Sequence, residues 1–401
     1  MSKIILEKIA VIGQGYVGFP LAIEACKAGY SVVGFDISSE RIKNIKDGNS
    51  PTEDVSAHIL KDLSNSKKYT PTTDIKFLNE CRIFIICVPT PLDNKQNPDL
   101  KPLISAVELV AKHIKPDDLI IIESTIAPGT TRNIILPLIE KVSMLESSNF
   151  GLVYSPERID PLNKEWNVSN TPKLVSGLSI DSANRATKFY NKFVTKVYVC
   201  DSFEIAETAK LLENSFRFIN ISFINELSIF CHSLGIDIKA VIEAADTKPY
   251  GFMPFYPSAG IGGHCIPVDP LYLAEKAREI GAPIKSINLA NQVNQEMPGY
   301  FVGRAEEKIG ELKGKKVLVI GVSYKPNVAD VRESPVEALI VGLKQKGAQV
   351  VWHDDLVKEW NGEKSVTLSS NFDLAIIATP HDYLDLTKIG NVPILNTRGS
   401  I

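Results

Sequence analysis

Cys265 closes a glycine-rich segment, Gly260-Ile261-Gly262-Gly263-His264-Cys265, and is followed by Pro267 and Asp269. Three glycines in four positions let backbone N–H groups converge on an anion. We expect Pro267 in the first turn of a helix, and a thiol at a helix start favours its thiolate form. Asp269 would then lie on the same helix face, near a water beside the sulfur. The segment predicts a nucleophilic cysteine, with a structural cysteine in a tight turn as the alternative; we interpret His264 as a packing residue.

A second set of polar residues lies in a long apolar stretch. Residues 202–234 contain no glycine or proline and are apolar on almost every side beyond Leu211, which predicts one helix buried between domains or subunits. Lys210 and Asn214 are one turn apart and point the same way. A lysine on so apolar a helix needs a partner, because an unpaired buried ammonium is costly. Either the pair forms a solvated flank, or it points into a site where Lys210 relays a proton.

A glycine motif, Gly13-Gln14-Gly15-Tyr16-Val17-Gly18, follows an apolar strand and opens a helix, and Asp36 ends the next strand 18 residues past Gly18. This spacing is typical of a dinucleotide site, where the glycines let the backbone approach a pyrophosphate and the acid accepts from the ribose hydroxyls. A carboxylate repels a 2′-phosphate, so the motif favours NAD over NADP. A tight turn without a ligand is the alternative.

Further polar groups follow other predicted strands. Val88-Pro89-Thr90-Pro91, Glu123-Ser124-Thr125 and Ser155-Pro156-Glu157-Arg158 come at strand ends, where open α/β sheets place their ligands. Near the C-terminus, Lys325, Arg332 and Arg398 also follow predicted strands. Together these cations suit a nucleotide diphosphate.

The elements that must position these residues alternate between strands and helices. Strands are predicted at 8–12, 31–36, 82–88 and 119–123, which indicates a parallel sheet with helices on both faces. Alternation returns with strands at 316–321, 349–353 and 373–379 and a helix at 336–346, and residues 315–354 repeat the plan of 8–36. The sequence therefore predicts an α/β protein with two Rossmann-like, doubly wound domains joined by a long central helix. We place the boundaries at 1–200, 201–300 and 301–401.

Composition excludes several function classes. The net charge of −3 gives no basic field for nucleic acid or an anionic membrane, and no stretch approaches the roughly 18 apolar residues of a bilayer span. The six cysteines form no CxxC pair, which favours the reducing cytoplasm, and the six scattered histidines predict no metal site. We interpret the first residues as leading into a strand rather than as a signal peptide.

Taken in order, the motifs GQGYVG, VPTP, ESTIAPGTT, SPER, the Lys210–Asn214 helix, GGHCIPVDP and KPNVADVRESP resemble the UDP-sugar 6-dehydrogenase family, from Lys8 to Arg398. The resemblance implies oxidation of the C6 alcohol of a UDP-sugar to a carboxylate with two NAD⁺. It also implies an N-terminal NAD domain, a C-terminal UDP-sugar domain, and a homodimer formed through the central helix.

The resemblance also implies roles for individual residues. The catalytic set has Cys265 as nucleophile, Lys210 as proton donor or acceptor, and around the reacting carbon and its water Asn214, Thr125, Glu157 and Asp269. The NAD set is Gly13, Gly15, Tyr16, Val17, Gly18, Asp36, Arg41, Thr90, Thr125 and Arg332. The UDP-sugar set is Glu157, Arg158, Lys210, Asn214, Tyr256, Gly260, Gly262, Lys325 and Arg398.

The same resemblance bears on the sugar. Val268 stands where members acting on UDP-glucose carry lysine, and Pro161 where they carry a second glutamate. SPERIDP and GGHCIPVDP resemble the N-acetylhexosamine branch, and residues 244–257 look most like UDP-N-acetylglucosamine 6-dehydrogenases of glycan precursor synthesis. Leu162 and Ser258-Ala259 depart from that pattern.

Several alternatives stay open. A UDP-N-acetylmannosamine dehydrogenase is the nearest, and a UDP-glucose 6-dehydrogenase is a further one in the same class. A two-electron 3-hydroxyacid dehydrogenase and a non-catalytic NAD-dependent sensor of nucleotide sugars are rivals of different classes.

Overall fold

The computed structural model describes residues 7–399 except 53, 54, 56, 67, 94, 95, 161, 162 and 164. Pro161 and Leu162, singled out above for sugar choice, therefore lie outside the described residues. The chain divides into two compact units, Met1–Leu212 and Glu213–Ile401, called here the N-terminal and the C-terminal unit.

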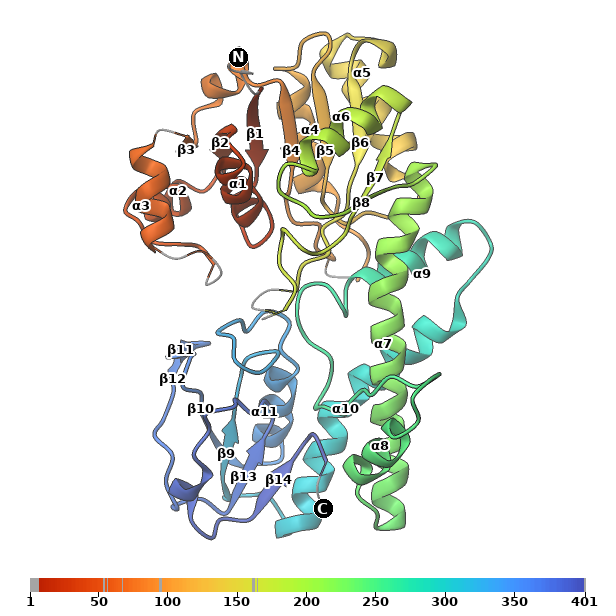
Figure 1. Cartoon of the computed structure of the whole chain (residues 1–401). Helices are drawn as coiled ribbons and strands as arrows, with labels where there is room; N and C mark the ends of the chain where they lie inside the picture. Colours follow the sequence, from red (N-terminus) through yellow and green to blue (C-terminus); the bar gives the residue numbers. More distant parts are fainter. Residues whose placement is uncertain are drawn as a thin grey trace. The chain divides into compact units, whose positions relative to one another are not determined.

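The N-terminal unit is built on an eight-stranded sheet in the order β3-β2-β1-β4-β5-β6-β7-β8 (Figure 1). All neighbouring strands are parallel except β6 and β7. The strands are β1 (Lys8–Ile12), β2 (Ser31–Phe35), β3 (Tyr69–Thr72), β4 (Ile83–Ile86), β5 (Leu119–Ile122), β6 (Gly151–Tyr154), β7 (Lys173–Gly177) and β8 (Val197–Val199).

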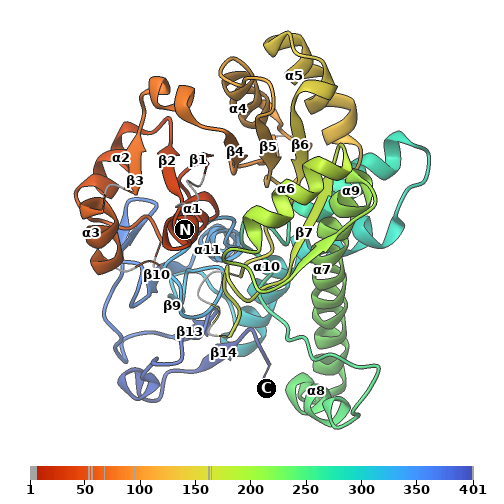
Figure 2. The same cartoon turned by 45° about the horizontal axis from the view of Figure 1, so that its top comes forward.

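Both faces of this sheet are covered, as its nearly continuous apolar strands require. Alternate side chains of β1 enter different cores: Ile9 and Val11 pack with α1 and α6, whereas Ala10 and Ile12 pack with α4 and α5. Helices therefore lie on both faces of the sheet (Figures 1 and 2). The helices are α1 (Gly18–Lys27), α2 (Ser39–Lys46), α3 (Ala57–Asn65), α4 (Lys101–Ala111), α5 (Leu136–Ser143) and α6 (Ile180–Tyr190), with the short helices η1 (Ile75–Glu80), η2 (Thr131–Ile135) and η3 (Ser147–Asn149).

The predicted long helix is confirmed as α7 (Phe203–Leu234), and the division between the two units falls within it. Within this one chain α7 is not buried on every side, and the expected burial between domains or subunits stays a prediction. One stripe of large apolar side chains, spaced by four or seven residues, is exposed: Ile205, Leu212, Phe216, Phe223, Phe230 and Leu234. Polar residues are buried elsewhere on the helix, among them Glu207 and Asn225, each with no exposed surface.

The C-terminal unit has a smaller parallel sheet, in the order β10-β9-β13-β14. Helices α10 and α11 cover one face (Figure 1), and the short helix η4 and neighbouring loops cover the other. Its elements are α8 (Ile238–Asp246), α9 (Asp269–Glu279), α10 (Lys285–Ile309), β9 (Lys316–Ile320), α11 (Val336–Gln345), β10 (Gln349–His353), β11 (Glu359–Trp360), β12 (Glu363–Lys364), β13 (Leu374–Ile377), η4 (Leu386–Ile389) and β14 (Ile394–Asn396).

The predicted fold class is confirmed: two Rossmann-like α/β domains and a long helix between them in sequence. No helix in the described part of the chain combines the length and apolar character needed to cross a membrane.

Candidate active site

The first glycine turn, between β1 and α1, contains glycines with different structural roles. Gly13 has φ +92°, and a Cβ there would stand 2.7 Å from the carbonyl oxygen of Cys87. A Cβ on Gly18 would overlap the carbonyl oxygen of Gly13. Nothing lies within 4 Å of where a Cβ of Gly15 would stand. Folding therefore requires the outer two glycines, and the middle one leaves the open space that a pyrophosphate at a helix start needs.

Asp36, directly after β2, faces this turn. Its Oδ2 accepts from the backbone N–H of Gln14 at 2.8 Å and from Arg41 Nη1 at 2.9 Å, and its Oδ1 accepts from Ser38 N at 2.9 Å. The carboxylate is thus fixed at the sheet edge beside the open glycine, and Arg41 is half-exposed next to it. This arrangement fits the ribose side of a dinucleotide.

Two other predicted NAD contacts lie at neighbouring strand ends. Thr90, after β4, donates from Oγ1 to the carbonyl oxygen of Thr125, after β5, at 2.8 Å. Ser124 ties the same two segments together, because its Oγ donates to Val88 O at 2.7 Å. The structure therefore brings Thr90 and Thr125 together, as expected from the strand order β4-β5.

Glu157 is held tightly after β6. Its Oε1 accepts from the backbone N–H groups of Arg158 and Ile159, both at 2.6 Å, and Lys173 Nζ lies 3.4 Å from Oε2. Arg158 donates from Nη1 to Pro172 O at 2.7 Å. Sequence reasoning missed Lys173, because a lysine at the start of a strand gives no local signal of burial.

The segment around Cys265 corrects two expectations. Helix α9 begins at Asp269, so Pro270 rather than Pro267 stands in its first turn, and Cys265 lies in the bend before the helix. Asp269 N nevertheless donates to Cys265 O at 2.8 Å, which closes one helix-like turn. The cysteine and the aspartate are thus joined through the backbone rather than by a shared helix face. Cys265 is exposed, whereas the other five cysteines are buried.

Asn214 and Asp269, predicted to surround the same carbon, do meet. Asn214 Nδ2 donates to Asp269 Oδ2 at 2.5 Å, and both side chains are buried. The long helix therefore fixes the aspartate that follows the exposed cysteine by four residues. Lys210, one turn earlier on α7, is 7% exposed and belongs to the N-terminal unit.

The glycines before Cys265 have a role beyond anion binding. A Cβ on Gly262 would stand 2.7 Å from the carbonyl oxygen of Glu333, and one on Gly263 would stand 2.8 Å from the Tyr324 ring. Gly263 N also donates to Arg332 O at 3.3 Å. These glycines let the cysteine loop pack directly on residues 324–335, so one of the N–H groups expected to face an anion is engaged by protein.

Sequence reasoning also missed how this loop is anchored. Asn294 on α10 accepts from Ile261 N at 2.6 Å, and Asn225 on α7 accepts from Ser258 N at 2.9 Å. Asn225 is a polar residue on an apolar helix, but the spacing of residues does not reveal its distant partner. Two side-chain amides, that of Asn225 fully buried, thus hold the loop in place.

The predicted UDP-sugar residues of the C-terminal unit are spread over several segments. Lys325 Nζ lies 5.9 Å from the centroid of the Tyr324 ring, Arg332 pairs with Asp330 at 2.5 Å, and burial lowers the pKa of Arg398. Burial, and then Arg332, lower the pKa of His264, so this imidazole is neutral near pH 7. Tyr256 is exposed. Lys325 and Arg332 belong to the segment 324–335, on which the Cys265 loop packs.

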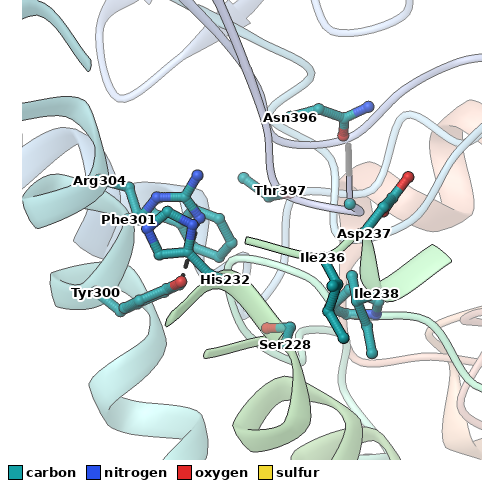
Figure 3. A pocket seen from close by; sticks show the side chains of 12 residues that line it. Ser228, His232, Ile236, Asp237, Ile238, Tyr300, Phe301, Arg304, Asn396 and Thr397 are labelled. Atoms are coloured by element: carbon teal, nitrogen blue, oxygen red, sulfur yellow. Dashed lines mark hydrogen bonds between the residues drawn. The ribbon is translucent and has the colours of Figure 1, made fainter. Parts of the chain in front are cut away.

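One pocket of the C-terminal unit is lined by residues of α7 and α10 and by residues at the end of β14 and just after it. His232 of α7 and Tyr300 and Arg304 of α10 line one side, and Asn396 and Thr397 line another (Figure 3). The residues predicted for catalysis or nucleotide binding are absent from its described lining. Among the described residues there is also no cluster of histidine, cysteine and carboxylate side chains that could hold a metal ion.

The open glycine, the fixed acid after β2 and the parallel sheet define a nicotinamide-dinucleotide-binding Rossmann domain. The protein is an NAD-dependent oxidoreductase, because the family model that matches this domain is the NAD binding domain of a dehydrogenase family. Its sequence matches the NAD binding domain (residues 7–194), the central domain (204–296) and the UDP binding domain (318–397) of the UDP-glucose/GDP-mannose dehydrogenase family. The chain belongs to that family, as the motifs predicted.

Relatives of this chain carry the names of UDP-sugar dehydrogenases. The chain is 40% identical to UDP-N-acetyl-D-glucosamine 6-dehydrogenase of Pseudomonas aeruginosa, over 86% of this chain and 81% of that protein. It is 34% identical to UDP-N-acetyl-D-mannosamine dehydrogenase of Methanococcus maripaludis, over 96% and 88%. The solved UDP-D-ManNAc dehydrogenase of Pyrococcus horikoshii superposes with a TM-score of 0.90 at 32% identity, over 98% and 95%.

Proposed function

We propose that this protein oxidises the C6 hydroxyl of a UDP-N-acetylhexosamine to a carboxylate in two steps at one site. The observation that carries the proposal is the exposed Cys265, joined through the backbone to Asp269, which is itself buried and bonded to Asn214. A two-electron dehydrogenase needs no such nucleophile. NAD⁺, when bound, accepts a hydride from C6, and it does so twice per sugar.

In the proposed chemistry Lys210, in its neutral amine form, takes the proton of the C6 hydroxyl and becomes an ammonium, and its buried position keeps that proton within the site. The thiolate of Cys265 attacks the resulting aldehyde and forms a thiohemiacetal, so the intermediate cannot diffuse away. The second oxidation leaves a thioester. Water activated by Glu157 or Asp269 then attacks the thioester carbon, and the thiol leaves as the carboxylate forms.

We propose UDP-N-acetylglucosamine as the substrate. Residues 244–257 support this choice, and so does the 40% identity to a protein named for that sugar. UDP-N-acetylmannosamine is the second candidate, favoured by relatives named for it at 33–34% identity. The two sugars differ only in the configuration at C2.

A panel of UDP-sugars with an NADH count tests the proposal. We expect two NADH per UDP-N-acetylglucosamine, and slower turnover with the manno, galacto and glucose compounds. One NADH per substrate would indicate a two-electron dehydrogenase, and none would indicate a sensor. Two NADH with UDP-N-acetylmannosamine alone would keep the chemistry and change the sugar.

We also propose the division of labour set out above: NAD binding in residues 1–200, dimerisation in 201–300 and UDP-sugar binding in 301–401. The three family domains, matched at 7–194, 204–296 and 318–397, support it. On this proposal Lys325, Arg332 and Arg398 face the nucleotides. The location that we propose is the reducing cytoplasm, as expected from the cysteine pattern, and the six cysteines, all among the described residues, form no disulfide.

We propose a homodimer through α7, and its exposed apolar stripe supports this, since contiguous apolar surface of this kind is typical of an interface. Phe223, which is 59% exposed, lies in the middle of the stripe. We expect Phe223→Glu to convert a dimer into a monomer in light scattering. Ile180→Glu, at an isoleucine 81% exposed on α6, is the control and should leave the mass unchanged. A stable monomer of the unmodified protein at micromolar concentration would refute the dimer.

A further inference from the structure

A buried lysine joins Glu157 to two other polar side chains of the N-terminal unit. Lys173 opens β7, and its side chain is 8% exposed. Its Nζ lies 2.7 Å from Glu123 Oε2 and 3.4 Å from Glu157 Oε2. Tyr190, at the end of α6, donates its hydroxyl to Glu123 Oε1, and Lys173 Nζ lies 5.3 Å from the centroid of its ring. One ammonium therefore serves two carboxylates.

Burial and neighbouring charges shift the pKa values of several groups in this cluster. Burial raises the pKa of Glu123 to about 7, against the opposing influence of Lys173. Burial lowers the pKa of Lys173, but Glu123 and Glu157 together raise it above its ordinary value. Cys87 also faces the group, and burial raises its pKa, so it stays a neutral thiol. Below about pH 7 Glu123 takes up a proton, and the ammonium is then left to Glu157.

The backbone fixes the geometry of this arrangement. Ser155, two residues before Glu157, donates from Oγ to Leu174 O at 2.7 Å, directly beside Lys173 in β7. Strand β7 therefore sets where the lysine stands relative to the carboxylate. Two backbone N–H groups occupy Glu157 Oε1, so Lys173 is the neighbour that orients Oε2.

We propose that Lys173 is a positioning residue for Glu157: it orients Oε2, while Glu123 and Tyr190 anchor the ammonium. The inference rests on the proposed role of Glu157 in activating water. It gives a buried ion cluster at a strand end a part in the chemistry. A cluster that served folding alone would affect stability, and its loss would lower kcat whether or not Glu157 is present.

A double-mutant cycle separates these readings. We expect Lys173→Met to lower kcat by about tenfold to a hundredfold, since small misplacements of a reacting group have such effects. In a Glu157→Gln background the same change should lower kcat by less than about twofold, because a residue acting through Glu157 has nothing left to position. Lys188→Met, an exposed lysine of α6, is the control. Losses that multiply in the double variant would overturn the proposal.

Two further readouts guard against a folding defect. Lys173→Arg should recover most of the activity, because it keeps a cation beside Glu157 Oε2. NAD⁺ affinity should be unchanged in Lys173→Met, which would show that the fold persists. A Lys173→Arg protein as slow as Lys173→Met would count against the proposal.

If Lys173→Met does not fold, Tyr190→Phe removes only the hydroxyl that anchors Glu123. Its kcat should fall several-fold, and only where Glu157 is present; a loss of the same size in the Glu157→Gln background would again overturn the proposal. If Glu157→Gln alone retained full activity, the role of Glu157 itself would be wrong. That outcome is distinct from a Glu157-dependent enzyme in which Lys173 acts independently.

Discussion

Two glycine turns of this chain, one in each unit, begin alike. Gly13 and Gly321 both have positive φ, +92° and +82°, and each N–H donates to the last carbonyl oxygen of the next strand at 2.8 Å. Asp36 directly follows β2, and Asp354 directly follows β10. The N–H of the residue after each glycine donates to the aspartate, at 2.8 Å and 2.9 Å. The similarity expected from the repeated sequence plan extends to individual hydrogen bonds.

The turns differ in what completes them. Asp36 pairs with Arg41, whose side chain is 44% exposed, whereas Asp354 Oδ2 contacts His381 Nε2 at 3.1 Å with neither side chain accessible. Gly15 opens onto empty space, but the corresponding Ser323 is fully buried. The first glycine and the acid are therefore a folding device common to both units. The capacity to hold a dinucleotide comes from the open middle glycine and from an acid whose partner, Arg41, is half-exposed rather than buried.

The largest expected effect is that of replacing Asp354, the buried aspartate of the turn in the C-terminal unit. Asp354 accepts from the backbone N–H groups of Val322, Leu356 and Val357 as well as contacting His381. We expect Asp354→Ala to destabilise the C-terminal unit by about 3–5 kcal/mol, since it leaves buried donors unpaired. Hydrogen exchange of the β9 and β10 amides measures this.

NAD⁺ affinity should stay unchanged in Asp354→Ala. The neighbouring Asp355→Ala is the control, because that side chain is 46% exposed. A loss of NAD⁺ binding in Asp354→Ala would break the comparison between the two turns.

Asp36→Ala should act on the ligand instead. Loss of an ionised acceptor for the ribose hydroxyls costs about 2 kcal/mol, or about thirtyfold in the NAD⁺ dissociation constant. Discrimination against NADP⁺ should weaken at the same time. Isothermal titration measures both, with Asp47→Ala at the exposed end of α2 as the control. An unmodified protein that used NADP⁺ as readily as NAD⁺ would show that Asp36 is wrongly assigned.

Gly15→Ala sharpens the same contrast. Gly15 does not take the left-handed conformation, so the fold should tolerate the methyl group. That methyl would occupy the space meant for a pyrophosphate, and we expect about a tenfold weaker NAD⁺ affinity with little change in melting temperature. Gly299→Ala, also into open space but within α10, should leave NAD⁺ binding alone. Equal NAD⁺ affinities for the two variants would contradict the assignment.

The smallest expected effect is a pH dependence of stability that arises from the lowered pKa of Asp354. Burial alone would raise the pKa of Asp354, but hydrogen bonds from His381 and two backbone N–H groups lower it to about 2. Because the folded pKa lies below the ordinary 3.8, the stabilisation is complete above that value and is lost as pH falls towards 2. Between pH 5 and pH 3 the stability difference between the wild type and Asp354→Asn should shrink by about 1 kcal/mol. A difference independent of pH would contradict the lowered pKa.

The order of strands and helices was predictable because the apolar runs are bounded by glycine and polar residues. Strand ends were less so: β4 stops at Ile86 rather than Val88, since Cys87 and Val88 turn towards Gly13 and Ser124. Motif residues such as Gly13, Gly18 and Asp36 were predictable because backbone geometry restricts what can stand there.

What sequence could not supply were partners distant along the chain. Lys173 meets Glu123, 50 residues away, and Asn294 meets Ile261 across 33 residues, and neither contact has a local pattern. The start of α9 was misplaced because two prolines, Pro267 and Pro270, both suited a first turn.

The count of NADH released per UDP-N-acetylglucosamine by Cys265→Ser, compared with the unmodified protein, tests the central claim most directly. Serine is close in size to cysteine, so the fold and NAD⁺ binding should persist, but its hydroxyl is hardly ionised near neutral pH. We expect two NADH per sugar from the unmodified protein and a loss of several orders of magnitude in that turnover for the variant, with at most an aldehyde-level product remaining bound. A Cys265→Ser protein that still released two NADH per sugar at a near-normal rate would contradict a covalent role for Cys265.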